Sequence, residues 1–469
     1  MKKEYSDGYF NVSKKFGFLP MFPCLNDNNF PNKFRILKDF CDNLPIIKKD
    51  NRLGILYYKN KIEEKVKELP NLINEINEMN DLFIKLDCKQ TEITISKKLI
   101  YQTLFRYYAF LTSTYCLEPT YNSYMKDKTY DKGRNIIPRN IAEPFCKVAD
   151  LLGCYPWLEY HYSYGLGNYT ITKQKGDCNY KLEDIKVDSL FCGDTDEINF
   201  IKVHILINLY SPILIGSIFD ILTNINIGNS TDVIKNLKIL KDCVHNMNEK
   251  RKYMWENSDK VRYGAYRIFL MGHTGNEKLF DEGVLYEGVN EKHVQYRGET
   301  GAQDDIIPTL DIFTGVTNYY PNNMLTKYLF ELRDYRPKVI IEFFNDLEKE
   351  SNNLTLKILE LCGAKGLIYF LVIINEIYLF RIGHWNFVKK YIMSNTKYNV
   401  ATGGTPLNLW LPNQIKACLE KMDEILHIIK YKCNLNDASE EELIVLSIIQ
   451  KEHKNKKDSL DKELEQFKN

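Results

Sequence analysis

The chain has 469 residues, of which 44% are hydrophobic, so it is long enough to bury a large core. Its 63 basic and 62 acidic side chains nearly cancel, which argues against nucleic acid or an anionic membrane as a partner. The twelve cysteines include no C-x-x-C pair. This pattern argues against a zinc knuckle or a compact disulfide framework and favours a reducing, cytoplasmic setting.

The apolar stretches favour a soluble protein. The start of the chain is charged and has no continuous apolar run, so we expect no secretory signal. The longest apolar stretch, residues 203–219, contains or adjoins Lys202, His204 and Asp220. The cost of placing these groups in lipid favours a buried helix of a soluble protein over a membrane span.

Residues 1–120 predict a small N-terminal helical domain. Short helical pieces such as residues 32–43 come first, and helical periodicity follows over residues 59–86 and 92–117. A polar stretch at residues 121–139 then predicts a linker to a second unit.

A large helical domain is expected over residues 140–434, beginning with helices at 141–152 and 156–166. The second of these is rich in aromatic residues, and aromatic residues at this density are more often core than ligand-binding. After an irregular insertion at residues 170–193, a long apolar helix carries His204 on a mostly apolar face, where a buried imidazole needs a partner.

Two helices follow the His204 helix. In the first, at residues 229–252, we interpret the polar side chains as a solvated face only. The second, at residues 258–272, places Arg267 on an apolar, aromatic face beside Tyr263 and Leu270. A buried guanidinium needs an anion, either an Asp or Glu of the chain or the carboxylate of a substrate.

Two glycine-containing loops are candidates for ligand contacts. Gly298 and Gly301 mark a loop that runs into a helix at about residue 304, which suits close approach to a flat or anionic ligand. Residues 394–406 contain a Gly-Gly pair between threonines, typical of a loop that closes over a site, although an ordinary exposed connection has the same composition.

The remaining segments are helical. We expect a helical block at residues 321–350, a helix at 409–432, and a charged C-terminal helical tail at 435–469 that starts with a capping sequence.

The helix at residues 366–392 predicts the centre of the site. Its apolar face carries a histidine, with Arg381 one turn before it; the face consists of Ile373, Ile377, Phe380, His384, Phe387, Val388 and Tyr391. An imidazole in an apolar space with a cation nearby suits an iron porphyrin. The alternative is a core histidine that bonds to a backbone carbonyl.

Six short blocks, in order and at suitable separations, resemble the indoleamine 2,3-dioxygenase family: residues 138–153, 266–276, 285–289, 297–303, 381–392 and 401–405. The resemblance implies an all-α fold in which a small N-terminal helical domain is joined to a large helical domain that encloses a pocket for haem b.

The resemblance also implies roles on the haem and carboxylate side of the site. His384 would be the proximal ligand of the haem iron, and Arg381, paired with Asp311, would support a haem propionate. Arg267 would bind the carboxylate of tryptophan, and Leu270 would line the pocket.

Two loops would complete the pocket. Gly298, Thr300 and Gly301 would belong to the distal loop that contacts haem and the substrate amine, and Thr402 and Gly403 to a mobile loop that closes over the amino acid.

The chain departs from the family pattern in ways that concern substrate choice. The usual distal loop GGSAGQSS is replaced by GETGAQDD, so Glu299, Asp304 and Asp305 add negative charge. Arg262 and Tyr263 stand where the family has two phenylalanines, the first of which lies near the indole, and we expect Tyr263 to contact the substrate.

His204 stands where the family mostly has a small distal residue. In this respect the chain is similar to the related tryptophan 2,3-dioxygenases, whose distal histidine meets the indole N–H. A family His-Arg pair expected near residues 340–341 is absent. The resemblance therefore implies that haem binding is kept and that the substrate can differ.

The resulting hypothesis is a dioxygenase that opens the indole C2–C3 bond of L-tryptophan with O2 and gives N-formylkynurenine, the first step of the kynurenine pathway. His204 and Arg267 would act on the substrate, and an electron donor would keep the haem ferrous. The alternatives are a dioxygenase for another indole and, since His204 suits a bound diatomic gas, a non-catalytic haem protein that binds oxygen. A haem-free interaction module is the remaining option.

Overall fold

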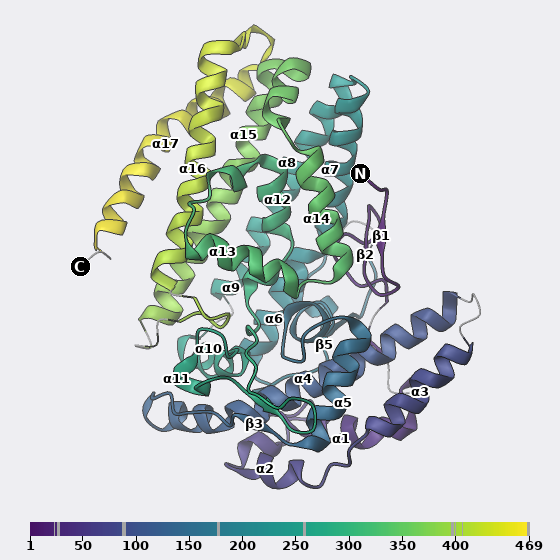
Figure 1. The fold of residues 1–469 in the computed structure, drawn as a ribbon. Coiled ribbons are helices and arrows are strands. Elements are labelled where there is room, and N and C mark those ends of the chain that lie inside the picture. Colours follow the sequence, from purple (N-terminus) through teal and green to yellow (C-terminus); the bar gives the residue numbers. More distant parts are fainter. Residues whose placement is uncertain are drawn as a thin grey trace.

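Helices form the body of the molecule, as predicted from the apolar periodicity (Figure 1). The computed structural model describes all residues except 23, 26–28, 87–90, 176–178, 257–258, 395–397, 399, 406 and 467–469. Within this described part, the strands form only three two-stranded sheets. The chain therefore has the all-α class expected from its sequence.

The N-terminal part contains β1 Tyr5–Ser6, β2 Asn11–Val12, α1 Arg35–Asp42, α2 Lys61–Val66, α3 Ile73–Leu86 and α4 Thr91–Asp127. The stretch predicted as one helix at residues 59–86 is divided because Pro70 interrupts it. The first residues of the stretch predicted as a linker are helical, since α4 continues through Asp127. Tyr121 and Tyr124 are buried there and hold this last part of the helix against the core.

The middle part contains β3 Ile136–Ile137, α5 Arg139–Leu152, β4 Tyr169–Ile171, β5 Ile185–Val187, α6 Thr195–Asn208, α7 Ser211–Asn226, α8 Ser230–Arg251, α9 Tyr253–Glu256, α10 Lys260–Arg267, α11 Glu277–Phe280 and β6 Leu285–Tyr286. The helix predicted at residues 156–166 is wrong. Only a π-helical turn, Tyr160–Tyr164, forms there, because the carboxylate of Glu159 accepts the backbone N–H groups of His161, Tyr162 and Ser163.

The C-terminal part contains α12 Ile306–Thr314, α13 Met324–Glu331, α14 Lys338–Glu350, α15 Leu354–Val388, α16 Leu407–Lys432 and α17 Glu440–Gln466. The long helix α15 packs along α8 and α16, and these helices run side by side in Figure 1. The predicted capping sequence is confirmed: the Ser439 N–H donates to Glu442 Oε2 at 2.8 Å, and the Glu442 N–H donates to Ser439 Oγ at 3.3 Å.

The first residues of the chain lie against α14. The ring of Phe343 is 5.7 Å from that of Tyr5 and 5.9 Å from that of Phe18, measured between centroids. Residues assigned to the N-terminal domain thus pack on a helix of the predicted large domain, and the domain boundaries remain a prediction.

Two helical stretches, Thr195–Asn226 and Leu354–Met393, are long and apolar enough to cross a membrane. In the first, 78% of the apolar window is buried inside the protein, and in the second 56%. The buried core helices of a soluble protein have the same character.

Candidate functional site

A single cavity gathers most of the residues predicted to form the site. It encloses about 1200 Å³, its open mouth included, and α6, α8, α10 and α15 contribute to its wall. The predicted site residues that line it are His204, Tyr263, Arg267, Leu270, Thr300, Gly301, His384 and Thr402. Much of the remaining wall is apolar or aromatic, as in Phe200, Trp255 and Phe387.

His384 and His204 present neutral imidazoles to this cavity. Burial lowers the pKa of His384 to about 4, helped by the charge of Arg251, and burial together with His384 lowers the pKa of His204 to about 4. Neither ring has a hydrogen bond to any other residue that the structure describes. The imidazole of His384 is therefore free to bind a ligand, and the alternative of a core histidine bonded to a backbone carbonyl is not found.

A metal at His384 would have to bring most of its own ligands. Within the described parts of the chain, no group of three or more His, Cys, Asp or Glu side chains could hold a metal ion. A porphyrin supplies four equatorial nitrogens to its iron and leaves the axial positions for protein side chains. A neutral imidazole on an apolar wall thus fits a haem.

Arg267 is a buried cation that faces the cavity without an anionic partner. Its side chain is 2% exposed, Nη2 donates to the carbonyl of Val400 at 2.5 Å, and Nη1 has no hydrogen bond to the residues that the structure describes. No carboxylate of the described chain lies within ion-pair distance of it. Since a desolvated guanidinium is costly without an anion, the site is suited to a ligand carboxylate.

Arg251, at the end of α8, is a second cation on the cavity wall, and the sequence reasoning missed it. Its Nε is buried without a hydrogen bond, and its guanidinium lies 5.6 Å from the ring centre of Phe380. A Cβ placed on Gly383 would be only 2.1 Å from Nη1, so the missing side chain makes room for Arg251 beside His384.

The prediction that the polar residues of α8 form only a solvated face is therefore wrong. Arg251 turns inward, and Asn248 is 5% exposed and donates to Glu376 Oε2 of α15 at 2.7 Å. The signal that the sequence offers for this is Gly383, a residue without a side chain directly before the candidate ligand.

Arg381 and Asp311 form the ion pair that the resemblance implied, but neither lines the cavity. Arg381 also donates through Nη1 to the carbonyl of Gln414 at 3.1 Å and to Cys418 Sγ at 2.8 Å. The buried guanidinium thereby joins α15 to α12 and α16. Its role at a haem propionate remains a prediction that this position does not support.

The loop before α12 supplies part of the cavity wall. Gly298 packs against the chain at Gly272, where an added Cβ would lie 2.2 Å from the Gly272 nitrogen. Gly301 leaves space beside His204, since a Cβ there would be 3.7 Å from Cε1 of that ring. Glu299, between them, is 4% exposed and lines the cavity.

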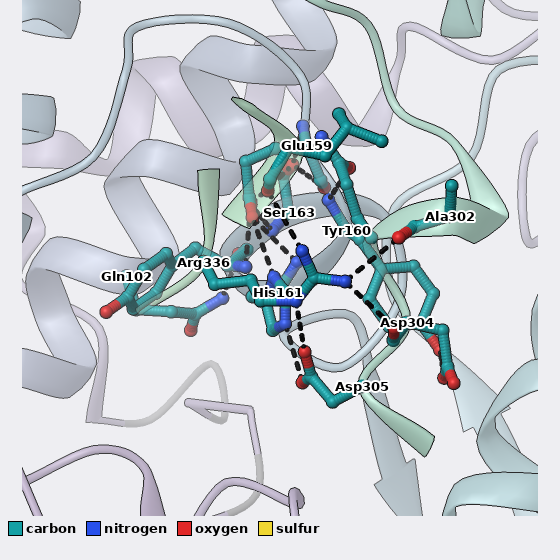
Figure 2. Close-up of polar contacts among 12 residues, drawn as sticks. Gln102, Glu159, Tyr160, His161, Ser163, Ala302, Asp304, Asp305 and Arg336 are labelled. Carbon is teal, nitrogen blue, oxygen red and sulfur yellow. Dashed lines mark hydrogen bonds and ion pairs between the residues drawn. The ribbon is translucent and has the colours of Figure 1, made fainter. Parts of the chain in front are cut away.

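A buried cation holds this loop from behind. Figure 2 shows the guanidinium of Arg336 between Ala302, Asp304 and Asp305: it donates to the carbonyl oxygens of Ala302 and Asp304 at 2.9 and 3.1 Å and to Asp305 Oδ1 at 2.8 Å. The other oxygen of Asp305 lies 2.8 Å from Nε2 of His161. Burial alone would lower the pKa of His161, but Asp305 and Glu159 raise it to about 9.

The loop around Thr402 lies close to α10 and its following turn. The Gly272 N–H donates to the Thr402 carbonyl at 3.1 Å, and Arg297 Nη1 donates to the Gly403 carbonyl at 3.0 Å. Gly403 does not line the cavity, and an added Cβ there would meet the Tyr328 hydroxyl at 2.3 Å. Closure of this loop remains a prediction, and parts of the predicted loop, residues 395–397, 399 and 406, lie outside the described residues.

The fold and the cavity define a class of protein: a largely helical protein with neutral imidazoles around one apolar pocket, and with guanidinium groups there that form no ion pair within the described residues. Comparison with known sequences narrows this class. The profile of the indoleamine 2,3-dioxygenase family matches residues 7–406, and the chain belongs to this family.

Several known proteins are similar to this chain in sequence. Rat indoleamine 2,3-dioxygenase 1 is 28% identical, over 48% of this chain and 55% of the relative, and the Saccharomyces cerevisiae indoleamine 2,3-dioxygenase is 27% identical, over 81% and 83%. A protein named myoglobin from Haliotis madaka is 25% identical, over 56% of this chain and 66% of its own length. The chain thus spans about half the length of the rat relative and most of the yeast one.

Proposed function

We propose that this chain is a haem-dependent dioxygenase that opens the indole C2–C3 bond of L-tryptophan with O2 to give N-formylkynurenine. The observation that carries the proposal is the neutral imidazole of His384, unbonded within the described chain, on the same cavity wall as the unpaired Arg267. Family membership supports the same reaction class.

The residues of the cavity fit haem b. His384 would bind its iron, and Arg251, desolvated beside His384, would bind one of its carboxylates. When bound, haem b supplies the iron at which O2 reacts, and an electron donor is a required partner that keeps this iron ferrous.

The chain itself positions the substrate. Arg267 would bind the carboxylate of the amino acid, and Tyr263 and Leu270 would contact the indole through the aromatic and apolar wall. His204, neutral and without a hydrogen bond in the described chain, would accept the indole N–H. Thr300 and Thr402 would close the polar end of the pocket and limit the entry of water.

The test is spectroscopic and chemical. The haem-reconstituted ferrous protein is expected to show a Soret band that shifts when L-tryptophan is added, and with O2 to yield a product heavier than tryptophan by both oxygen atoms. Absence of the Soret band, or a band that tryptophan does not perturb together with unchanged tryptophan, would contradict the proposal.

A second candidate is a haem protein that binds oxygen without oxidising a substrate. The similarity to the Haliotis madaka protein named myoglobin favours it, as does the neutral His204 beside the space left by Gly301. A long-lived oxygenated spectrum that L-tryptophan leaves unchanged, with no oxidised product, would select this candidate over the dioxygenase.

We also propose a cytoplasmic location. Ten cysteines lie in the described part of the chain, and all of them are free and buried or half-buried. Free thiols are kept in this state by a reducing compartment.

The role given to Arg251 leads to a prediction about cofactor retention. Arg251→Ala is expected to weaken haem binding by about 10- to 100-fold, since a charge-assisted hydrogen bond contributes roughly 1.5–3 kcal/mol. Haem transfer to apomyoglobin measures the loss. With haem dimethyl ester, whose carboxylates are blocked, the variant and the parent should release cofactor at the same rate.

Lys252→Ala is the matched control for this experiment. Lys252 is the next residue and is exposed, and within the described chain its side chain bonds to Glu249 of α8, at 2.5 Å. The Lys252→Ala substitution should leave the rate of haem release unchanged. Equal release of unmodified haem by the Arg251 variant and the parent would show that Arg251 does not hold a propionate.

A further inference from the structure

One carboxyl group in the cavity has no function in the chain itself. Glu299 is 4% exposed and lines the cavity, yet its carboxyl group makes no hydrogen bond or ion pair with any described residue. A buried carboxyl without partners is destabilising, whether neutral or charged, unless a ligand meets it.

Two other acidic side chains, one on the cavity wall and one in the first turn of α6, have hydrogen-bond partners. Asp304, on the same wall, accepts hydrogen bonds from the Tyr160 hydroxyl at 2.9 Å and from Asn208 Nδ2 at 2.7 Å. Glu197 accepts three backbone N–H groups at 2.7–2.9 Å. Glu299 therefore differs from the acidic side chains that stabilise the fold.

Glu299 does not serve to neutralise Arg267. No ion pair joins the two side chains, although both line the cavity and both influence Tyr263, whose pKa is raised to about 12 by burial, lowered by Arg267 and raised further by Glu299. The cavity wall thus carries an acid without a partner, Glu299, in addition to the cation Arg267, and neither neutralises the other within the described chain. This arrangement is complementary to the carboxylate and the ammonium group of an amino acid.

We propose that Glu299 binds the ammonium group of the substrate, so that the pocket selects indoles that carry an amine. The assignment rests on the proposed function, because it places the indole amino acid in this cavity. It also predicts that an amine without a carboxylate, such as tryptamine, is accepted, whereas an indole acid without an amine lacks this contact.

The protonation of Glu299 agrees with this assignment. Burial and the nearby charge of Glu159 raise its pKa to about 8. Tyr160, Tyr164 and Tyr263 are the other titratable groups that interact with it. Without a cation the carboxyl keeps its proton near neutral pH, and a bound ammonium group stabilises the carboxylate.

Three ligands and two variants test the proposal on the ferric, haem-loaded protein by calorimetry. The ligands are L-tryptophan, tryptamine and indole-3-propionate. Glu299→Gln, which keeps the shape of the side chain, should weaken tryptophan and tryptamine by about 10- to 100-fold and leave indole-3-propionate unchanged. Arg267→Gln should weaken tryptophan and indole-3-propionate and leave tryptamine unchanged.

Asp304→Asn is the matched control, because it removes a carboxyl of the same wall that already has partners. It should leave the ratio of tryptamine to indole-3-propionate affinity as in the parent. A Glu299→Gln variant that weakens all three ligands equally, or none, while tryptophan turnover persists, would overturn the assignment alone. If the parent bound none of the three ligands, the proposed function would be overturned with it.

Discussion

Replacing His384 with alanine is expected to remove the Soret band of the reconstituted protein, with a loss of haem affinity greater than ~100-fold. Removing a group that only supports a metal ligand typically lowers metal affinity by about 10- to 100-fold. The loss expected here is larger because the variant lacks the ligand itself. A hemin titration of the purified apoprotein measures it. Added free imidazole should restore part of the band, since the deleted ring leaves a space of its own size.

Two further histidine variants make this result specific. His204→Ala should keep the Soret band, because His204 is proposed to contact substrate and not iron. His427→Ala should change nothing, since His427 is exposed and lies outside the cavity. A full-strength band in the His384 variant would remove the basis of the haem assignment.

Replacing Asp305 with asparagine is expected to destabilise the fold by about 3–5 kcal/mol, the usual cost of removing one partner of a buried ion pair. Asp305 is buried, pairs with Arg336 at 2.8 Å and lies 2.8 Å from His161, so the change leaves the buried guanidinium of Arg336 without its anion and His161 with only Glu159, at 3.6 Å. Urea unfolding at pH 7 measures the change in free energy.

Asp50→Asn provides the matched control. Asp50 pairs with Arg52 at 2.6 Å in an exposed position, where ion pairs contribute at most about 1 kcal/mol. A comparable loss of stability in the two variants would mean that the Asp305 cluster is not an essential support of the fold.

The same cluster predicts a pH dependence. The pKa of His161 is raised to about 9 in the folded protein, from an ordinary value of about 6.5. Its stabilisation, on the order of 3 kcal/mol, is therefore fully present below pH ~6.5 and is lost as the pH rises through 9. Burial raises the pKa of Glu197 to about 7 and that of Glu299 to about 8. These two carboxyl groups therefore also make the folded protein less stable as the pH rises, over a lower pH range. The contribution of His161 is isolated by the difference in unfolding free energy between the parent and the Asp305→Asn variant, measured as a function of pH. If the two stability curves were parallel above pH 7, the prediction for His161 would be contradicted.

Much of the fold could be predicted because long helices repeat their apolar side chains at a fixed spacing. This spacing identified α5, α8 and α16 and the half of α15 that carries His384. It failed at residues 156–166, where a single side chain, Glu159, captures the backbone N–H groups of a tight turn. Local capping of this kind leaves no periodic signal.

The site was predicted where one helix supplies both the residue and its surroundings. His384 and Arg267 lie on apolar faces that their own helices define, and both line the cavity. Arg251 could not be found in this way, because the direction of its side chain depends on a glycine of another helix. For Arg381 the position one turn before His384 suggests the cavity, but its guanidinium pairs with Asp311, and neither residue lines the cavity.

The ion pair of Arg381 with Asp311 has a consequence for how the cofactor enters. Together with the bonds of Arg381 to Gln414 and Cys418 of α16 and to the hydroxyl group of Tyr320, it fixes the helix that carries His384. If haem binds at His384, as proposed, we expect the folded chain to hold this imidazole in place before the porphyrin enters. We therefore expect the proposed prosthetic group to exchange on a folded apoprotein, without passage through the unfolded state.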